Sequence, residues 1–333
     1  MKKAIITGIT GQDGSYLAKS LLEKNYKVYG AQRRNTGKRY WRLDELGITD
    51  QIEFVDIDLG EPYNIEKTID IIQPDEFYNL AAQSFVGLSF EQPQVTTITN
   101  SLGVLNILEV IRNKYPKIKF YQASTSEMFG KVTETPQKET TRFYPRSPYG
   151  CAKAYSHYLT VNYREAYNLF ACSGILFNHE SPMRGEEFVT RKITKGLAVW
   201  QKTGKPVELG NLDSKRDWGH AEDYVEAQYL MLQQEKPEDY VIATGQTYSI
   251  RDFIKMCLNY MNVPYIEKGH EFHHKLLNKP IIVTNLKFFR PAEVDLLVGD
   301  SSKAKKQLNW QPKHDLNSLV NDMMKFDLER IDG

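Results

Sequence analysis

A tyrosine and a lysine lie four residues apart in the segment Tyr149-Gly-Cys-Ala-Lys153. On a helix this spacing puts both side chains on one face, so the lysine ammonium would lie beside the phenol. A positive charge there favours phenolate and would lower the tyrosine pKa from its ordinary value of about 10. Such a phenol can remove the proton of a hydroxyl group during its oxidation. The same pattern also begins at Tyr63, in a crossover helix, and at Tyr115, before a strand; only Tyr149 opens a long helix.

A second group of reactive residues follows a strand expected at Ile118–Ala123, in the order Ser124-Thr125-Ser126-Glu127. Hydroxyl groups at the carboxyl edge of a parallel sheet can bind and polarise a substrate oxygen. A carboxylate adds a different capability, because it can take a proton from a carbon next to a carbonyl. The spacing alone is equally compatible with Glu127 as a surface helix cap.

The amino-terminal strand runs directly into Thr7-Gly8-Ile9-Thr10-Gly11-Gln12-Asp13-Gly14, a GxxGxxG turn followed by a helix. Glycines at these positions permit a tight turn and let backbone N–H groups approach a pyrophosphate at the positive end of the helix. A helix that merely starts with glycines is the alternative. The position after the first strand favours a dinucleotide site. In a site beside nicotinamide, loss of a hydroxyl proton to Tyr149 would accompany hydride transfer from the same carbon.

The second expected strand ends in Gln32-Arg33-Arg34, where NAD enzymes usually carry an acidic residue for the ribose 2′-hydroxyl. Guanidinium groups there would attract a 2′-phosphate, since their planar donors can hold phosphate oxygens in pairs. The pattern therefore favours NADP over NAD. The alternative is that both arginines face water.

These residues need a parallel α/β sheet to position them, and the order of strands and helices predicts one. We expect strands near Lys3–Thr7, Lys27–Gln32, Ile52–Asp56, Glu76–Leu80, Ile118–Ala123 and Phe170–Phe177. We expect helices at Ser101–Lys114, Tyr149–Tyr167, Glu187–Lys202, Ala221–Gln233, Ile250–Met261 and Leu316–Arg330. This pattern predicts a Rossmann-type doubly wound sheet in residues 1–177 and a smaller, mostly helical substrate lobe in residues 178–333, with some segments returning to the first domain.

Composition narrows the possible classes of protein. The chain has 333 residues, and 43 basic residues nearly balance 42 acidic ones, which argues against general binding to nucleic acid or membrane surfaces. Its apolar runs are too short for a membrane span or a signal peptide, so we expect a cytoplasmic protein. Three widely spaced cysteines and an isolated His273-His274 pair, expected in a solvated loop, indicate neither disulfides nor a metal site.

Ten sequence blocks between Gly8 and Asp295 resemble the extended short-chain dehydrogenase/reductase family and, within it, the GDP-mannose 4,6-dehydratase group. They read GITGQDGSYL, LAAQSFV, STSEMFG, FYPRSPYGCAK, NYREAY, GILFNHESP, FVTRKIT, RDWGHAEDY, MLQQ and FFRPAEVD. The resemblance implies an NADP-dependent dehydration of GDP-mannose or a close GDP-sugar: C4 is oxidised, water leaves C5 and C6, and the hydride returns to C6. It also implies a homodimer or homotetramer.

The resemblance carries roles over to matching residues. Tyr149 and Lys153 would serve the C4 oxidation, Thr125 would hydrogen-bond the reacting oxygen, and Glu127 would take the C5 proton. Cofactor contacts are implied at Gly8, Ile9, Thr10, Gly11, Gln12, Asp13, Gly14, Arg33, Arg34, Asp58, Leu59, Leu80, Ala81, Ala82, Gln83, Ser84, Tyr149, Lys153, His179 and Arg184. Substrate contacts are implied at Ser84, Asn178, Lys192, Arg216, Arg290 and Glu293.

Other functions remain open at this level. A GDP-heptose dehydratase fits the same residues, whereas a GDP-sugar 4-reductase or epimerase of the same fold would not require Glu127 as a base. A regulator that binds NADP without catalysis is a further alternative, opposed by the intact Thr125, Glu127, Tyr149 and Lys153. The stretch from Lys268 to Lys287 has no counterpart in the resemblance, and we expect either an extended loop near the nucleotide pocket or a surface addition.

Overall fold

A central seven-stranded sheet forms the larger part of the molecule in the computed structural model, which describes residues 1–33, 37, 40–288 and 296–331. All its strands are parallel and follow the order β11-β6-β5-β4-β1-β2-β3. Their bounds are β1 (Lys3–Thr7), β2 (Lys27–Gln32), β3 (Glu53–Asp56), β4 (Glu76–Asn79), β5 (Lys119–Thr125), β6 (Ala171–Leu176) and β11 (Tyr240–Ile242). The order reverses at β1, so the expected doubly wound sheet is confirmed, and β11 is an addition that the sequence analysis did not predict.

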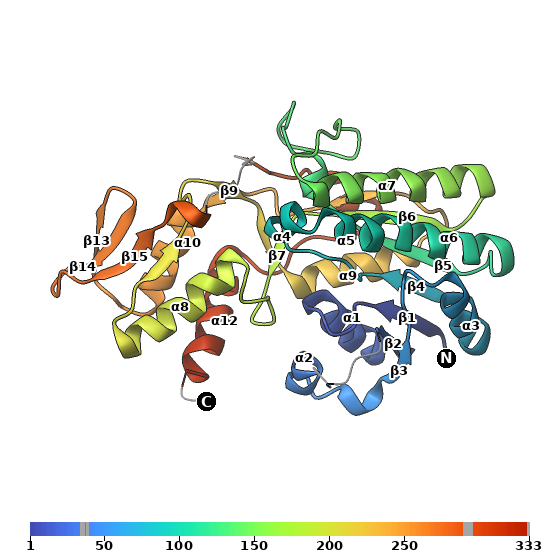
Figure 1. The fold of residues 1–333 in the computed structure, drawn as a ribbon, viewed down its shortest axis with the longest axis horizontal. Helices are drawn as coiled ribbons and strands as arrows, with labels where there is room; N and C mark the ends of the chain where they lie inside the picture. The colour runs from blue at the N-terminus through green and yellow to red at the C-terminus, as the bar shows by residue number, and fades with distance from the viewer. Residues whose placement is uncertain (34–36, 38–39, 289–295, 332–333) are drawn as a thin grey trace.

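Helices cover both faces of this sheet (Figure 1). One face packs against α3 (Pro62–Ile72), α6 (Gly103–Lys114) and α7 (Pro148–Tyr167), with α4 (Val86–Glu91), α5 (Pro93–Thr97) and the π-helical turn η2 (Ile98–Leu102) beside α7. The other face packs against α1 (Gln12–Glu23), α2 (Trp41–Glu45), α9 (Ala221–Leu232) and α11 (Ser302–Leu308). Both faces are therefore buried, as is typical of parallel sheets.

The smaller lobe lies at the left of Figure 1 and has its own core. Its helices are α8 (Val189–Thr203), α10 (Ile250–Tyr260) and α12 (Leu316–Glu329). They pack beside a four-stranded sheet of β8 (Val207–Leu209), β13 (Tyr265–Lys268), β14 (Glu271–His274) and β15 (Pro280–Thr284). Two further two-stranded ladders pair β7 (Asn178–Glu180) with β10 (Trp218–His220) and β9 (Lys215–Arg216) with β12 (Tyr248–Ser249).

The four-stranded sheet excludes one of the two alternatives for the stretch from Lys268 to Lys287 and corrects the prediction for the His273-His274 pair. The stretch from Lys268 to Lys287 is not an extended loop, because β14 and β15 pair antiparallel within it and β15 pairs with β8. The His273-His274 pair lies in β14 rather than in a solvated loop; the His274 ring stacks on Trp200 and the His273 Nε2 lies 2.8 Å from a Glu271 carboxylate oxygen. The β-branched run Pro280–Thr284 was the available signal for this sheet.

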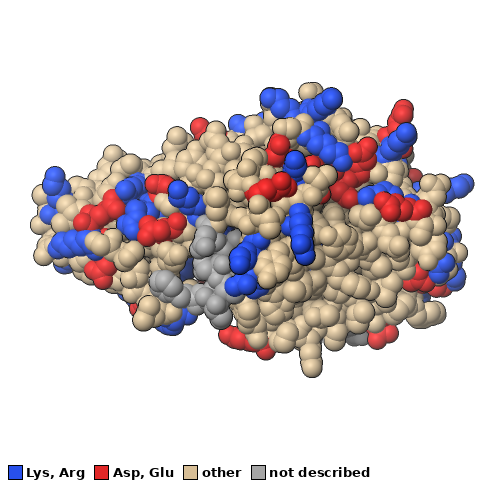
Figure 2. Space-filling model, turned by 90° about the horizontal axis from the view of Figure 1, so that it is seen from above, with Lys and Arg blue, Asp and Glu red and all other residues tan. Residues whose placement is uncertain are grey.

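Charged side chains of both signs occur on the face of the molecule that Figure 2 shows, beside a broad area without charge. Basic and acidic side chains are interspersed on the face shown in Figure 2, in keeping with a formal net charge of +1. Among the described residues, no helix combines the length and the apolar character needed to cross a membrane. An anionic ligand must therefore be bound by local groups rather than by a broad basic surface.

Candidate active site

A cleft of about 1360 Å³ opens at the carboxyl edge of the central sheet. This edge is where ligands of open α/β sheets bind. The four predicted catalytic residues all line the cleft: Thr125, Glu127, Tyr149 and Lys153. It is also lined by most of the predicted cofactor residues, namely Gly8, Thr10, Gly11, Gln12, Asp13, Gly14, Arg33, Asp58, Leu59, Leu80, Ala81, Ala82, Gln83, Ser84, His179 and Arg184, and by the predicted substrate residue Asn178.

The glycine turn between β1 and α1 forms one wall. Gly8 has φ +71°, and a Cβ there would lie 2.9 Å from the Ala81 backbone nitrogen. A Cβ at Gly14 would lie 2.3 Å from the Gly8 carbonyl oxygen, so the helix can approach the turn only without a side chain. The Thr7 hydroxyl accepts hydrogen bonds from the backbone N–H groups of Leu80 and Ala81 at 3.0 and 3.1 Å, which joins this turn to the end of β4.

The Asn178 Oδ1 and the Gln83 Oε1 are buried polar atoms of cleft-lining side chains that no described residue satisfies, whereas the Arg184 Nε lies 3.0 Å from a Glu180 carboxylate oxygen. Buried polar groups are normally hydrogen-bonded, so such atoms in a cleft are candidates for ligand contacts. Together with the glycine turn and the first turn of α1, they fit a dinucleotide that lies along the carboxyl edge of the sheet.

The opposite wall comes from α7, whose start is well defined. Pro148 occupies the first helical turn, and the Ser147 hydroxyl accepts a hydrogen bond from the Gly150 N–H at 3.0 Å. A Cβ at Gly150 would lie 2.9 Å from the Glu127 carbonyl oxygen, so α7 packs closely against the turn after β5. This packing brings Tyr149 and Glu127 to one cleft.

The Tyr149 phenol is buried, with 8% of the side chain exposed. Burial raises the pKa of Tyr149 to about 12, and the nearby Glu127 carboxylate adds to this rise. A hydrogen bond with the Thr125 side chain and the charge of Arg184 oppose it. At neutral pH the phenol is therefore protonated and bonded to Thr125.

The expected tuning of Tyr149 by Lys153 is wrong in this structure. The Lys153 ammonium lies 5.9 Å from the centre of the Tyr149 ring and donates to the Ala123 carbonyl at 2.7 Å. The pKa of Tyr149 lies above its ordinary value rather than below it, because burial outweighs nearby positive charge. Burial also lowers the pKa of Lys153, to about 8. Tyr149 and Lys153 thus lie next to each other as predicted, but the Lys153 ammonium is hydrogen-bonded to a backbone carbonyl of β5.

Some predicted site residues lie elsewhere. Ile9 is fully buried in the core behind the glycine turn. Lys192, on α8, packs its ammonium over the Phe288 ring, and Arg216, on β9, donates to the Lys215 carbonyl; neither lines the cleft described above. The predicted residues Arg34, Arg290 and Glu293 lie outside the described residues.

Comparisons with known proteins show to which family the chain belongs. The sequence pattern of the family described as GDP-mannose 4,6 dehydratase matches residues 5–323. The chain belongs to the GDP-mannose 4,6-dehydratase family. It is 51% identical to the GDP-mannose 4,6 dehydratase of Drosophila melanogaster, covering 98% of this chain and 86% of that one, and 47% identical to the Homo sapiens protein, covering 98% and 91%.

Solved structures show the same fold at lower identity. A UDP-glucose 4-epimerase from Thermotoga maritima, solved with UDP-glucose, has a TM-score of 0.83 and 24% identity over 97% of this chain and 98% of that one. A dTDP-glucose 4,6-dehydratase from Bacillus anthracis, solved with NAD, has a TM-score of 0.82 and 20% identity over 100% and 98%. The GDP-mannose 4,6-dehydratase family thus shares its architecture with other enzymes named for nucleotide-sugar substrates.

Part of the cleft wall in this family member consists of residues that were not predicted from the sequence. Ser124 and Ser126, whose hydroxyls were expected at this edge of the sheet, line the cleft. Several residues that were not predicted lie at the carboxyl ends of strands, where proximity to the glycine turn was the available signal: Thr7, Ala31, Gln32, Asp56, Ile57, Ala123, Leu176 and Phe177. Others come from the turns and helices after β3 and β4, and their placement depends on tertiary packing: Gly60, Asn64, Leu88, Gln92, Val95, Ile98 and Thr99.

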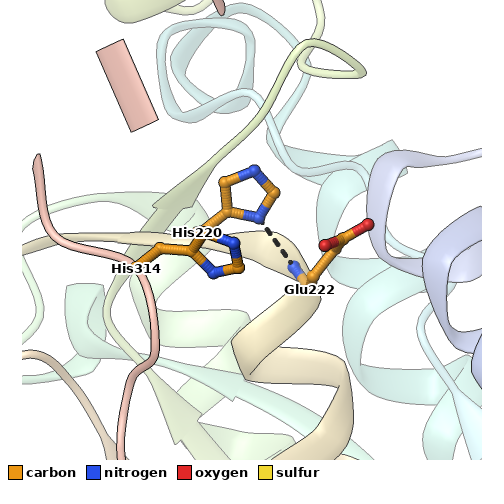
Figure 3. A group of neighbouring side chains, drawn as sticks. All are labelled: His220, Glu222 and His314. Carbon is orange, nitrogen blue, oxygen red and sulfur yellow. Dashed lines mark hydrogen bonds between the residues drawn. The ribbon is translucent and has the colours of Figure 1, made fainter. Parts of the chain in front are cut away.

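His220, Glu222 and His314 form a cluster outside the cleft, with ligand atoms within 4.8 Å of one another (Figure 3). The His220 Nδ1 accepts a hydrogen bond from the Glu222 N–H at 3.2 Å, and its Nε2 lies 3.1 Å from an Asp322 carboxylate oxygen. The His314 ring stacks on His220 with centroids 4.4 Å apart, while the Glu222 carboxylate points away from both rings. Because both His220 nitrogens are engaged, this cluster caps α9 and joins it to α12 rather than holding a metal.

Proposed function

We propose that this chain catalyses the 4,6-dehydration of GDP-mannose to GDP-4-keto-6-deoxymannose and water. Membership of the GDP-mannose 4,6-dehydratase family, with relatives at 47–51% identity over nearly the whole chain, supports the reaction. The observation that carries the proposal is that Thr125, Glu127 and Tyr149 line one cleft together with the glycine turn. This arrangement suits an enzyme that must act on both a hydroxyl oxygen and a neighbouring carbon.

Each residue has a distinct task in this proposal. The Tyr149 phenol first gives up its own proton to solvent, a step that the positive charges of Lys153 and of the oxidised cofactor would favour. Its Oη then takes the proton of the C4 hydroxyl, and the Thr125 Oγ1 holds the C4 oxygen beside it. A ketone at C4 makes the C5 hydrogen acidic, and the Glu127 carboxylate removes it. That proton and the hydroxide lost from C6 together make up the released water. When the hydride returns to C6, C5 takes up a proton that balances the one lost from the C4 hydroxyl. Lys153, held on the Ala123 carbonyl, supports the position of this wall and supplies positive charge.

We propose NADP as the cofactor. When bound, it supplies a hydride acceptor for C4 and then a hydride donor for C6, so it is unchanged overall. The residues that would hold it are the glycine turn, Asp58, Ala81, Ala82, His179 and Arg184. Arg33 is exposed at the end of β2 and lines the same cleft, where it suits a 2′-phosphate.

The reaction is tested by incubating the purified protein, with NADP bound, with GDP-mannose and following product mass and NADPH absorbance. Loss of one water without net NADPH is expected. Accumulating NADPH would indicate a simple dehydrogenase, and cofactor binding without turnover would indicate a regulator. A parallel incubation with a GDP-heptose tests the alternative sugar, which should react more slowly.

The cofactor preference is tested at Arg33. An Arg33→Ala variant should bind NADP about tenfold more weakly and NAD almost unchanged, because only the 2′-phosphate loses a charge-assisted hydrogen bond. Arg112→Ala is a matched control, since Arg112 pairs with Glu109 on α6 and does not line the cleft. Equal weakening of NADP and NAD would reject a role for Arg33 at the 2′-phosphate.

A further inference from the structure

An acidic side chain lies where the proposed cofactor site should meet phosphate. Asp13 is in the first turn of α1, and its Oδ2 lies 2.8 Å from the Nε2 of His179 on β7. Both side chains line the cleft, with only 18% and 13% of their surfaces exposed. A buried carboxylate at a helix N-terminus would repel a diphosphate unless its charge were cancelled.

Hydrogen-bond geometry determines the charge of His179. Its Nδ1 lies 2.7 Å from the Phe177 carbonyl oxygen, and its Nε2 faces the Asp13 carboxylate. A carbonyl oxygen and an ionised carboxylate are acceptors only, so both ring nitrogens must carry protons. The ring is therefore an imidazolium cation.

The titration of the two groups agrees with this assignment. Burial by itself raises the pKa of Asp13, but the charge and hydrogen bond of His179 outweigh it and hold the value at about 2. Burial lowers the pKa of His179, but the Asp13 carboxylate outweighs this effect and raises it above the ordinary histidine value. Each partner thus keeps the other ionised.

Side chains of α9 and of the first turn of α1 hold the pair in place. The Tyr224 ring of α9 stacks on the His179 ring at 4.6 Å, and Gln228 of the same helix lies 3.4 Å from the Asp13 Oδ2. The Gln12 side chain donates to both the Asp13 carboxylate and the His179 carbonyl at 3.1 Å. Among charged and titratable groups, Asp13, Arg184 and Tyr224 face the imidazole, and Arg184 opposes its protonation.

We propose that His179 is a positioning residue whose constant positive charge cancels the Asp13 carboxylate, so that the cofactor diphosphate meets no net negative charge at the start of α1. This inference rests on the proposed dinucleotide site. It assigns the two residues a joint role: Asp13 orients the imidazolium, and the imidazolium makes Asp13 compatible with phosphate.

A double-mutant cycle on cofactor affinity tests the proposal. His179→Gln should weaken NADP binding about 30-fold, because it leaves Asp13 charged beside the diphosphate. Asp13→Asn should weaken it only a few-fold, and the double variant should bind at least about tenfold more tightly than His179→Gln alone. A double variant no better than His179→Gln would overturn the proposal. His273→Gln is the control, since His273 pairs with Glu271 in the other lobe.

Histidine resonances followed by NMR in the cofactor-free protein provide a second readout that does not depend on turnover. Because its folded pKa is raised, the His179 imidazolium should persist as pH rises past the ordinary histidine range. In Asp13→Asn its titration midpoint should fall, since burial remains and the carboxylate is gone; an unchanged midpoint would overturn the pairing. If the wild-type protein binds no NADP while this shift is observed, the cofactor assignment fails and the ion pair stands.

Discussion

A Glu127→Gln variant should oxidise GDP-mannose at C4 but fail to release water. Glutamine keeps the size of the side chain, but its amide cannot accept a proton from C5 at neutral pH. The later hydride return to C6 requires the elimination, so NADPH should accumulate to at most one equivalent per site. The rate of water loss should fall by about 10²- to 10⁴-fold, the usual contribution of a positioned general base.

The Glu127 prediction is checked by NADPH absorbance in a single turnover and by the mass of the product. In D₂O the wild-type product should carry deuterium at C5, because the original C5 proton leaves with the water and C5 is reprotonated by groups that exchange with solvent. Substrate recovered from the variant should carry none. Glu165→Gln, an exposed position on α7, is the matched control and should behave as wild type. Dehydration by Glu127→Gln at the wild-type rate would remove Glu127 from the mechanism.

Tyr149→Phe should abolish the first step, since phenylalanine keeps the ring and loses the hydroxyl that receives the C4 proton. We expect turnover to fall by about 10²- to 10⁴-fold, with no transient NADPH. This outcome differs from that of Glu127→Gln, in which NADPH does form. The two variants therefore separate oxidation from elimination.

The Tyr149 result needs a control for folding, because the residue is buried. Tyr155→Phe removes a phenol from the same helix where the side chain is 46% exposed and does not line the cleft. It should retain wild-type activity, and both variants should keep the thermal unfolding midpoint within a few degrees. Residual turnover above about one tenth of wild type in Tyr149→Phe would mean that another group takes the C4 proton.

Local patterns explain which parts of the site could be predicted. The glycine turn needs only the spacing of Gly8, Gly11 and Gly14 after a buried strand, and Tyr149 and Lys153 need only one helical turn. These relations lie within a few residues, where backbone geometry alone decides which side chains share a face. The predicted lowering of the Tyr149 pKa by a neighbouring positive charge was wrong. Burial depends on the whole fold, and it raises this pKa more than nearby positive charge lowers it.

Pairings between strands that lie far apart in the sequence could not be predicted. The Pro280–Thr284 run has β-branched residues, but its parallel partner β8 lies more than seventy residues earlier in the chain. The edge strand β11 could not be predicted for the same reason. It has only three residues, it follows α9 in the chain, and it pairs with β6 of a sheet whose first strand lies at the amino terminus. A strand this short carries little periodicity, so its pairing partner must come from the tertiary structure.

The sequence by itself determined the doubly wound fold class, the glycine turn and the identities of the residues that can move protons, because each depends on local spacing or on the connection of neighbouring elements. Only the tertiary structure decided that Glu127 and Tyr149 share one cleft, that Lys153 bonds to β5, and that Asp13 meets His179 across 166 residues of chain. Ionisation and proton transfer act over a few ångströms of space, and that distance is set by packing rather than by position in the chain.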